Sequence, residues 1–306
     1  MAKSDPLPTI SNDADFERFM ELGPVQEVLQ SLGDALGLGP LKRPARGSVL
    51  VGLTESEVLK VFPPHEAGPA ALEVACLQAL QGKLPILTAR VLDHGTRDGW
   101  PWILMQRLPG QELAEAWPTL TRTQHLDLAA QLGRTLKVLH TLPPPALVPQ
   151  VDWTGWCAQR LPDLQAKQRS KGCPEALLDG LQSFVEGCDL RPGRMAWLHT
   201  EIMREHLLVE QTSEGIKLSG LFDFEPSWVG PVDYEYGAVG LFFSAGDAQI
   251  LRVVLHAAGV EIAPERLFAL TMMHRYANLG WYHSRLGGPI SHQALARAWF
   301  GTNLDA

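Results

Sequence analysis

Residues 199–209 read HTEIMREHLLV and residues 221–225 read LFDFE, and these two segments decide the fold. The polar stretch 210–217 lies between them and is typical of a hairpin turn that joins two short strands. A hairpin returns the chain to the end from which it started. The spacing therefore predicts that the carboxylates of Glu201 and Asp223 face a common cleft.

Upstream of these segments, the apolar pattern predicts a small β-rich part of the chain. Four short strands are expected there, at 48–53, 58–62, 89–95 and 102–106. Helical spacing of apolar residues predicts one helix over 68–82 and, before the strands, a helix or helix pair over 13–36. After residue 110 the pattern is mostly helical, with short β segments at 195–198, 207–210 and 216–222.

These elements predict an α+β fold with two lobes, a small β-rich N-lobe and a larger, mainly helical C-lobe. The chain has 306 residues, and at about 150 residues per domain this length also favours two domains or lobes. The expected division is an N-terminal helical extension over 1–41, an N-lobe over 42–107 and a C-lobe over 108–306.

The composition excludes several classes of protein. The chain has 26 basic and 34 acidic residues, a net charge of −8, which argues against a nucleic-acid partner and weakly favours a cationic small molecule. The longest apolar stretch, 237–246, is far shorter than the ~20 residues of a membrane-spanning helix. The N-terminus lacks the apolar core of a secretory signal. We therefore expect a cytoplasmic protein without a membrane partner.

The cysteines are expected to be buried or half-buried thiols in a reducing compartment. They form no CxxC pair, and their spacing fits no zinc ribbon. The four residues concerned are Cys76, Cys157, Cys173 and Cys188.

The two segments quoted above resemble the active-site motifs of the aminoglycoside phosphotransferase and choline kinase branch of the protein-kinase-like fold. That branch carries H-x-D-x-x-x-x-N on a catalytic loop and a D-F-G-like stretch after a hairpin. His199, Glu201 and His206 stand at the His, Asp and Asn positions of the first motif. Asp223 stands at the metal-binding Asp of the second. The order of the upstream elements also agrees, and the resemblance covers about residues 42–245.

The resemblance implies a nucleotide site that takes ATP or GTP. Lys60, in the strand 58–62, is similar to the family's phosphate-binding lysine, and Glu73 is similar to the helix residue that pairs with it. Residues 105–110 resemble the family's strand-to-hinge segment. The residues expected to bind the nucleotide are Lys60, Glu73, Ser48, Gln106, Leu108, Leu208 and Phe222.

The resemblance also implies the chemistry of a small-molecule kinase, in which the γ-phosphate of ATP passes to a hydroxyl of a small substrate. Glu201 would accept the proton of that hydroxyl or orient it, and His199 would orient the catalytic loop. Asp223 and His206 would hold Mg²⁺ or Mn²⁺. The negative net charge favours a cationic substrate.

Several residues depart from the family's motifs. Glu201 replaces Asp, and a shift of about one bond length could cost on the order of a hundredfold in rate. His206 replaces Asn at a metal position, where imidazole suits Mn²⁺ better than Mg²⁺. Glu225 replaces Gly and could restore an oxygen ligand or face solvent, while Pro231 and Glu235 fill two Asp positions of the family's G-D-P-x-x-D stretch. The alternative to an active kinase is therefore a catalytically impaired, pseudokinase-like binding module.

The histidines leave a third alternative, a non-haem iron enzyme. His199 and Glu201 would then form a two-His-one-carboxylate triad with a distal histidine, His256, His274 or His283. The aromatic residues near the C-terminus are expected to pack between helices or to form a cage that captures an ammonium group. They are His274, Tyr276, Trp281, Tyr282 and His283.

Overall fold

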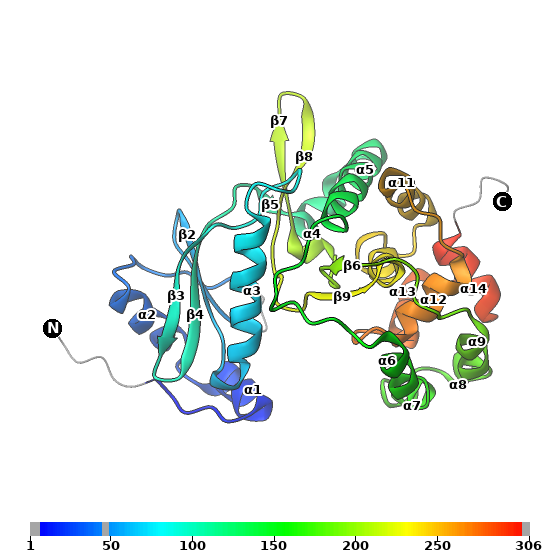
Figure 1. Cartoon of the computed structure of the whole chain (residues 1–306), viewed down its shortest axis with the longest axis horizontal. Coiled ribbons are helices and arrows are strands. Elements are labelled where there is room, and N and C mark those ends of the chain that lie inside the picture. The colour runs from blue at the N-terminus through cyan, green and yellow to red at the C-terminus, as the bar shows by residue number, and fades with distance from the viewer. Residues whose placement is uncertain (1–6, 45–48, 302–306) are drawn as a thin grey trace. The chain divides into compact units, whose positions relative to one another are not determined.

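The computed structural model describes residues 7–44 and 49–301, which form two compact units (Figure 1). Unit 1 comprises the described residues up to Lys83, together with Leu87–Pro109 and Gly220–Glu225. Unit 2 comprises Leu84–Ile86, Gly110–Ser219 and the described residues from Pro226 onward. The predicted α+β class, with a small antiparallel sheet and a larger helical part, is confirmed. The three-part division at residues 41 and 107 stays a prediction.

Unit 1 is built around a four-stranded antiparallel sheet with the strand order β1-β2-β4-β3. Its strands are β1 (Leu50–Leu53), β2 (Glu57–Val61), β3 (Val91–Arg97) and β4 (Trp100–Gln106). The predicted strands are therefore present, with ends shifted by at most two residues. β2 is an inner strand, in which Lys60 lies opposite Val51 of β1 and Ile103 of β4.

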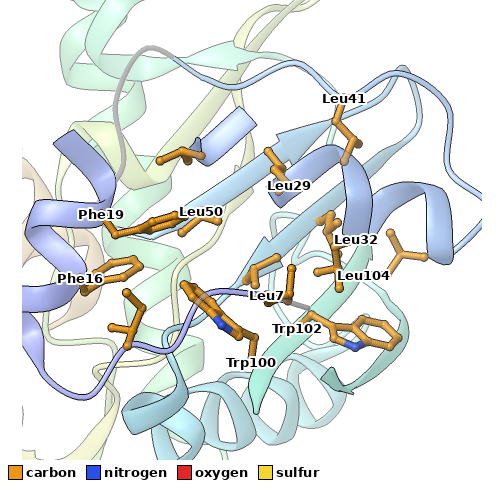
Figure 2. Packing of buried hydrophobic residues seen from close by; sticks show 14 residues of the cluster. Leu7, Phe16, Phe19, Leu29, Leu32, Leu41, Leu50, Trp100, Trp102 and Leu104 are labelled. Carbon is orange, nitrogen blue, oxygen red and sulfur yellow. The ribbon is translucent and has the colours of Figure 1, made fainter. Parts of the chain in front are cut away.

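The two faces of this sheet have different neighbours, because successive side chains of a strand point to opposite sides. The helices of unit 1 are α1 (Asp13–Leu22), α2 (Val25–Ala35) and α3 (Ala67–Leu80), with a short 3₁₀ turn η1 (Pro64–Glu66) before α3. Leu59 and Val61 are buried in a hydrophobic cluster. The same cluster contains Phe16 and Phe19 of α1 and Leu29 and Leu32 of α2 (Figure 2). Lys60, which lies between Leu59 and Val61 in the strand, points to the other face, toward α3.

The helix or helix pair predicted over 13–36 is a pair. Asn12 caps α1, since its side chain accepts the backbone N–H of Asp15. At the other end, the Gly23 N–H donates to the carbonyl of Phe19, and a Cβ on residue 23 would collide with the Phe19 ring. Pro24 follows, so the chain turns and begins α2.

Unit 2 is mainly helical and contains two small sheets. One consists of β5 (Gln111–Glu112), β7 (Leu207–Thr212) and β8 (Gly215–Leu221), and the other of β6 (Met195–Leu198) and β9 (Trp228–Pro231). The hairpin expected between Glu201 and Asp223 is thus formed by β7 and β8. The helices are α4 (Leu113–Ala116), α5 (Arg122–Leu139), α6 (Trp153–Arg160), α7 (Leu164–Ser170), α8 (Glu175–Leu178), α9 (Leu181–Gly187), α10 (Val232–Ala238), α11 (Ala248–Ala258), α12 (Pro264–Met273), α13 (Leu279–Leu286) and α14 (His292–Phe300).

Shorter helical segments complete unit 2, namely the 3₁₀ turns η2 (Trp117–Thr119) and η3 (Arg204–His206) and the π-helical segment η4 (Val239–Phe243). The packing of α5 against α11 depends on a glycine. A Cβ on Gly133 of α5 would collide with the backbone carbonyl of Val254 of α11. The absence of a side chain there lets the two helix backbones approach closely.

The structure describes the state of the cysteines and the length of the apolar helices. All four cysteines are free thiols, of which three are buried and Cys188 is half-buried. Within residues 7–44 and 49–301, no helix has both the length and the apolar character needed to cross a bilayer.

Candidate active site

A single buried lysine gathers three carboxylates in unit 1, and we call these four residues the Lys60 cluster. The Nζ of Lys60 lies 2.7 Å from an Oε of Glu73, 2.5 Å from an Oδ of Asp223 and 2.5 Å from an Oε of Glu225. It also lies 4.9 Å from the centre of the Phe62 ring. The side chains of Lys60 and Glu73 are only 7% and 2% exposed, so their ion pair is shielded from water.

Three segments that are far apart in the sequence supply this cluster. Lys60 comes from β2 and Glu73 from α3, while Asp223 and Glu225 follow the end of β8. The end of β8 is fixed within unit 1, because the Leu221 N–H donates to the carbonyl of Leu87 at 3.0 Å. Asp223 has a φ of 74°, a left-handed conformation that costs a non-glycine residue roughly 1–3 kcal/mol. Strain of this kind is concentrated at functional sites.

The charges in the Lys60 cluster shift one another's titration. Burial alone would lower the pKa of Lys60, but the three carboxylates outweigh it and hold that pKa well above its usual value. Burial raises the pKa of Glu73. Burial, with the like charges of Asp223 and Glu73, raises the pKa of Glu225 to about 7, against the opposing effect of Lys60. One cation thus faces three acids, and the cluster has an excess of negative charge when all three are ionised.

The donor atoms of the Lys60 cluster fit a divalent cation. Carboxylate oxygens of Glu73, Asp223 and Glu225 lie within 4.8 Å of one another. Such oxygens are the ligands that Mg²⁺ and Mn²⁺ prefer. The sequence left open whether Glu225 supplies an oxygen ligand or faces solvent, and the structure places it beside Asp223 on the lysine.

A buried glutamate of unit 2 holds the segment 199–206, which we call the Glu201 loop. The carboxylate of Glu235, on α10, accepts the backbone N–H of His199 at 2.7 Å and that of Thr200 at 2.8 Å. Glu235 is fully buried, and the ring of His140 lies 3.6 Å from its carboxylate. Hydrogen bonds from N–H groups to a charged carboxylate are about twice as strong as neutral ones. Glu235 therefore fixes the position of the backbone that carries Glu201.

Thr200 is strained, and its neighbours hold it in place. Its φ is 72°, in the left-handed region that disfavours a β-branched residue. Its hydroxyl donates to the carbonyl of Pro226 at 3.1 Å, and its own carbonyl accepts Nε2–H of His274 at 3.1 Å. Burial lowers the pKa of His274 to about 4, and its Nδ1 accepts the backbone N–H of Tyr276. The imidazole is therefore neutral, with its proton on Nε2, as this contact requires.

The side chain of Glu201 is buried and paired with an arginine. It is 4% exposed, and one Oε contacts Nη2 of Arg275, whose side chain is 51% exposed. The backbone N–H of Glu201 donates to Nδ1 of His199 at 3.3 Å, and its carbonyl accepts Nδ1–H of His206 at 2.9 Å. A neutral His206 then has its lone pair on Nε2, as a metal ligand requires. The structure thus brings His199, Glu201 and His206 together within unit 2.

The remaining residues expected to bind a nucleotide lie on both units. Gln106 is exposed at the end of β4, and its backbone N–H donates to the carbonyl of Arg90. Leu108 and Phe222 in unit 1 and Leu208 on β7 in unit 2 are half-buried. Ser48 lies outside the described residues. The part that these residues play in nucleotide binding stays a prediction.

The structure does not assemble the alternative iron site. Nε2 of His274 donates to Thr200, Nε2 of His283 lies 3.0 Å from the carbonyl of Gly288, and His256 is exposed. In the part of the chain that the structure describes, no group of three potential ligands joins His199 and Glu201 with one of these histidines.

Three of the C-terminal aromatic residues pack on Phe242, while the rings of Tyr276 and Trp281 stay about half exposed. The ring of Phe242 lies 5.1 Å from that of His274, 6.2 Å from that of Tyr276 and 6.1 Å from that of Tyr282. The guanidinium of Arg275 lies 4.8 Å from the Tyr276 ring centre, and that of Arg285 lies 3.7 Å from the Trp281 ring centre. The protein's own cations therefore occupy positions where a captured ammonium group would bind.

Sequence reasoning missed three features of the Glu201 loop. It placed Glu235 at a motif position but assigned it no contact with the loop backbone. It assigned no strain to Thr200 and no role to Arg275. One feature of the sequence could have indicated the contact of Glu235 with the loop. Glu replaces Asp at both 201 and 235, so both side chains are one methylene longer than the Asp side chains of the resembled motifs. Arg275 lies 74 residues beyond Glu201 and follows no motif, so only coordinates could reveal the pair.

Several solved structures are similar to this chain in fold. The GDP and kanamycin complex of APH(2")-IIia superposes with a TM-score of 0.66 at 18% identity, over 76% of this chain and 82% of that one. Macrolide 2'-phosphotransferase MphH from Brachybacterium faecium gives 0.60 at 21% identity, over 89% and 98%. The ADP-bound aminoglycoside phosphotransferase APH(2'')-Ib gives 0.60 at 16% identity, over 90% and 99%. These similarities establish a shared fold, which is the kinase-like fold that the sequence predicted.

Comparisons of sequence agree with this result. A search of curated proteins finds no match. A family model described as the phosphotransferase enzyme family matches residues 46–270, which is most of the chain. The chain therefore belongs to the phosphotransferase enzyme family.

Proposed function

We propose that this phosphotransferase is a small-molecule kinase that transfers the γ-phosphate of ATP or GTP to a hydroxyl group. The observation that carries the proposal is the buried ion pair of Lys60 with Glu73, joined by Asp223. A lysine held by carboxylates in a kinase-like fold is suited to binding nucleotide phosphates. The solved neighbours with GDP and with ADP support a nucleotide as the donor.

The nucleotide would bind through the ammonium of Lys60 and through side chains around it. Because the carboxylates keep Lys60 charged, it can bind the α- and β-phosphate oxygens at any physiological pH. Glu73 would hold the lysine in that position. Gln106, Leu108, Leu208 and Phe222 would contact the base.

Asp223 and Glu225 are the residues of unit 1 that would hold Mg²⁺ or Mn²⁺, and His206 of the Glu201 loop is the further candidate ligand. A bound divalent ion supplies charge neutralisation for the phosphate oxygens during transfer. The two oxygen donors close together on Lys60 are the observation that supports this assignment.

Glu201 would act on the acceptor. As the acceptor oxygen forms its bond to the γ-phosphorus, the bond from that phosphorus to the bridging oxygen of the β-phosphate breaks, and ADP or GDP leaves. The hydroxyl proton passes to the carboxylate of Glu201. Glu235 and His199 would position that carboxylate through the loop backbone.

The alternative of an impaired, pseudokinase-like module has no support in the comparisons, since the matched structures carry the names of phosphotransferases. We also propose that the enzyme works in the cytoplasm, where ATP and Mg²⁺ are available.

The proposal is tested by nucleotide binding and turnover. Wild-type protein is titrated with ADP in the presence of Mg²⁺ or Mn²⁺ and followed by thermal shift, and ATP consumption is then measured across a panel of hydroxyl compounds. We expect ADP to stabilise the wild type and Lys60→Met to abolish this effect. Lys83→Met, which removes an exposed lysine of the same unit, is the matched control and should bind normally. No stabilisation of the wild type by any nucleotide would refute the proposal.

A further inference from the structure

We propose that the phosphate acceptor carries an anionic group that binds Arg275, next to a planar or aromatic portion, and that this binding releases Glu201. The inference rests on the proposed function and names its substrate class. It departs from the cationic substrate that the net charge favoured.

The first observation is the pair of Glu201 and Arg275. Glu201 is buried, whereas the arginine on its Oε is half exposed, so the arginine can exchange its partner from the solvent side. While Arg275 neutralises this carboxylate, Glu201 is a poor acceptor for a hydroxyl proton. A carboxylate or phosphate on the substrate would compete for the guanidinium, to which it can bind through two parallel hydrogen bonds.

The second observation is the charge of the surrounding chain. Although the protein has 34 acidic residues, the sequence from 266 to 304 contains no Asp or Glu. Arg160 and Lys171 both act electrostatically on His274, the residue before Arg275, and Lys171 donates to the carbonyl of Ala277 at 2.6 Å. Two basic side chains thus lie near Arg275, and they disfavour a polycation there.

The third observation concerns two exposed rings, that of Tyr276, which Arg275 contacts, and that of Trp281, which Arg285 contacts. Tyr276 and Trp281 are 47% and 46% exposed, which is unusual for large aromatic residues. Arg275 and Arg285 already lie on these rings. An ammonium ligand would have to displace an arginine from its ring, whereas an anionic ligand would gain an ion pair with that arginine. A planar group could stack on the exposed parts of the same rings.

These observations together describe a switch of Arg275 between two partners, which we call the gate. With no acceptor bound, Arg275 pairs with Glu201. When an anionic acceptor binds, the guanidinium moves to the substrate anion, and the carboxylate becomes available to the hydroxyl. An acceptor without an anion would leave the gate closed.

The test uses two probes that are matched in shape and opposite in charge, benzoate and benzylammonium. Their binding to the ADP-loaded protein is measured by ligand-observed NMR, for the wild type and for Arg275→Gln, Arg275→Lys and Arg297→Gln. We expect benzoate to bind the wild type at least about tenfold more tightly than benzylammonium, which corresponds to about 1.4 kcal/mol. Arg275→Gln should abolish this preference, and Arg275→Lys should retain part of it.

Arg297→Gln is the control, because it removes an exposed arginine of the same acid-free stretch that pairs with Glu265. It should leave the preference intact. Equal binding of the two probes, tighter binding of benzylammonium, no binding of benzoate, or a preference that survives in Arg275→Gln would each overturn the inference. ADP binding, measured on the same samples, separates the two proposals. If ADP binds but the charge preference is absent, only the substrate class is wrong, and if ADP fails to bind the wild type, the kinase proposal is wrong.

Discussion

The Lys60 cluster of unit 1 is held by contacts between charged side chains, whereas the Glu201 loop of unit 2 is held mainly by hydrogen bonds to its backbone. In the Lys60 cluster, the attraction between opposite charges holds the side chains in place. In the Glu201 loop, the directions of hydrogen-bond donors and acceptors hold the backbone in place. Removing a charge should therefore damage the cluster most, and small changes of length or protonation should damage the loop most.

The largest effect is expected from Lys60→Met, which leaves three buried or half-buried carboxylates without their cation. Breaking a buried ion pair by removing one partner costs about 3–5 kcal/mol. We expect a loss of that size in the free energy of unfolding at pH 7, measured by urea denaturation. Lys83→Met should change it little. If the two variants were equally stable, the cluster would not depend on charge.

Lowering the pH should destabilise the folded protein through His274, which donates a hydrogen bond to Thr200 of the Glu201 loop. The pKa of His274 is near 6.5 in the unfolded chain and about 4 in the folded protein, because burial disfavours its charged form. Between these values the unfolded state binds more protons than the folded state. The stability that neutral His274 contributes is therefore fully present above about pH 6.5 and is lost as the pH falls toward 4. The difference of about 2.5 pH units corresponds to roughly 3 kcal/mol.

The measurement is the free energy of unfolding at pH 7 and at pH 4.5 for the wild type and His274→Gln. Glutamine keeps an N–H donor for the Thr200 carbonyl but does not titrate. The variant should lose less stability than the wild type on acidification. The same loss in both proteins would show that His274 is not the residue responsible.

Glu201→Asp keeps the charge of the side chain and shortens it by one methylene. If the Glu201 loop is built for the longer side chain, ATP turnover with any accepted substrate should fall by about a hundredfold, while ADP affinity stays the same. An impaired module whose glutamate is a defect would instead gain activity from this change. The two outcomes have opposite signs, so a single kinetic assay distinguishes them.

The smallest effect is expected from Glu235→Gln, which leaves one acceptor oxygen for two backbone N–H groups. One buried N–H then lacks its partner, at a cost of about 1–3 kcal/mol. We expect a lower thermal midpoint and a lower kcat with unchanged ADP affinity. Glu265→Gln is the control, since its exposed ion pair with Arg297 should contribute less than about 1 kcal/mol. If Glu265→Gln lowered stability as much as Glu235→Gln, the loop would not need the buried acceptor.

Much of the fold could be predicted from the sequence, because local patterns encode it. The apolar run around Lys60 placed that residue in a strand, where its charge needs water or a carboxylate, and the order of elements indicated the kinase-like fold. The pairing of Lys60 with Glu73 followed from the resemblance and is present in the structure. The break within 13–36 depends on Gly23 and Pro24, and the sequence left one or two helices open there.

Much of the candidate site could not be predicted, because it depends on contacts between distant residues. Glu225 could have pointed either way from its position after Asp223, and only the fold placed it on Lys60. Arg275 and His274 reach the Glu201 loop from a segment whose aromatic residues gave no sign of these contacts. The left-handed backbone conformation of Thr200 and Asp223 could not be predicted, because neither residue is a glycine, the residue type that usually marks this conformation.

We propose that the Lys60 cluster and the Glu201 loop act on the same phosphate. A crystal structure with ADP, Mg²⁺ or Mn²⁺ and a transition-state mimic of the γ-phosphate tests it directly. We expect the side chains of Lys60, Asp223 and Glu201 all to surround the bound phosphates, with Glu201 nearest to the acceptor hydroxyl. A complex in which Glu201 lies away from the nucleotide, or in which Lys60 and Asp223 contact none of its phosphates, would contradict it.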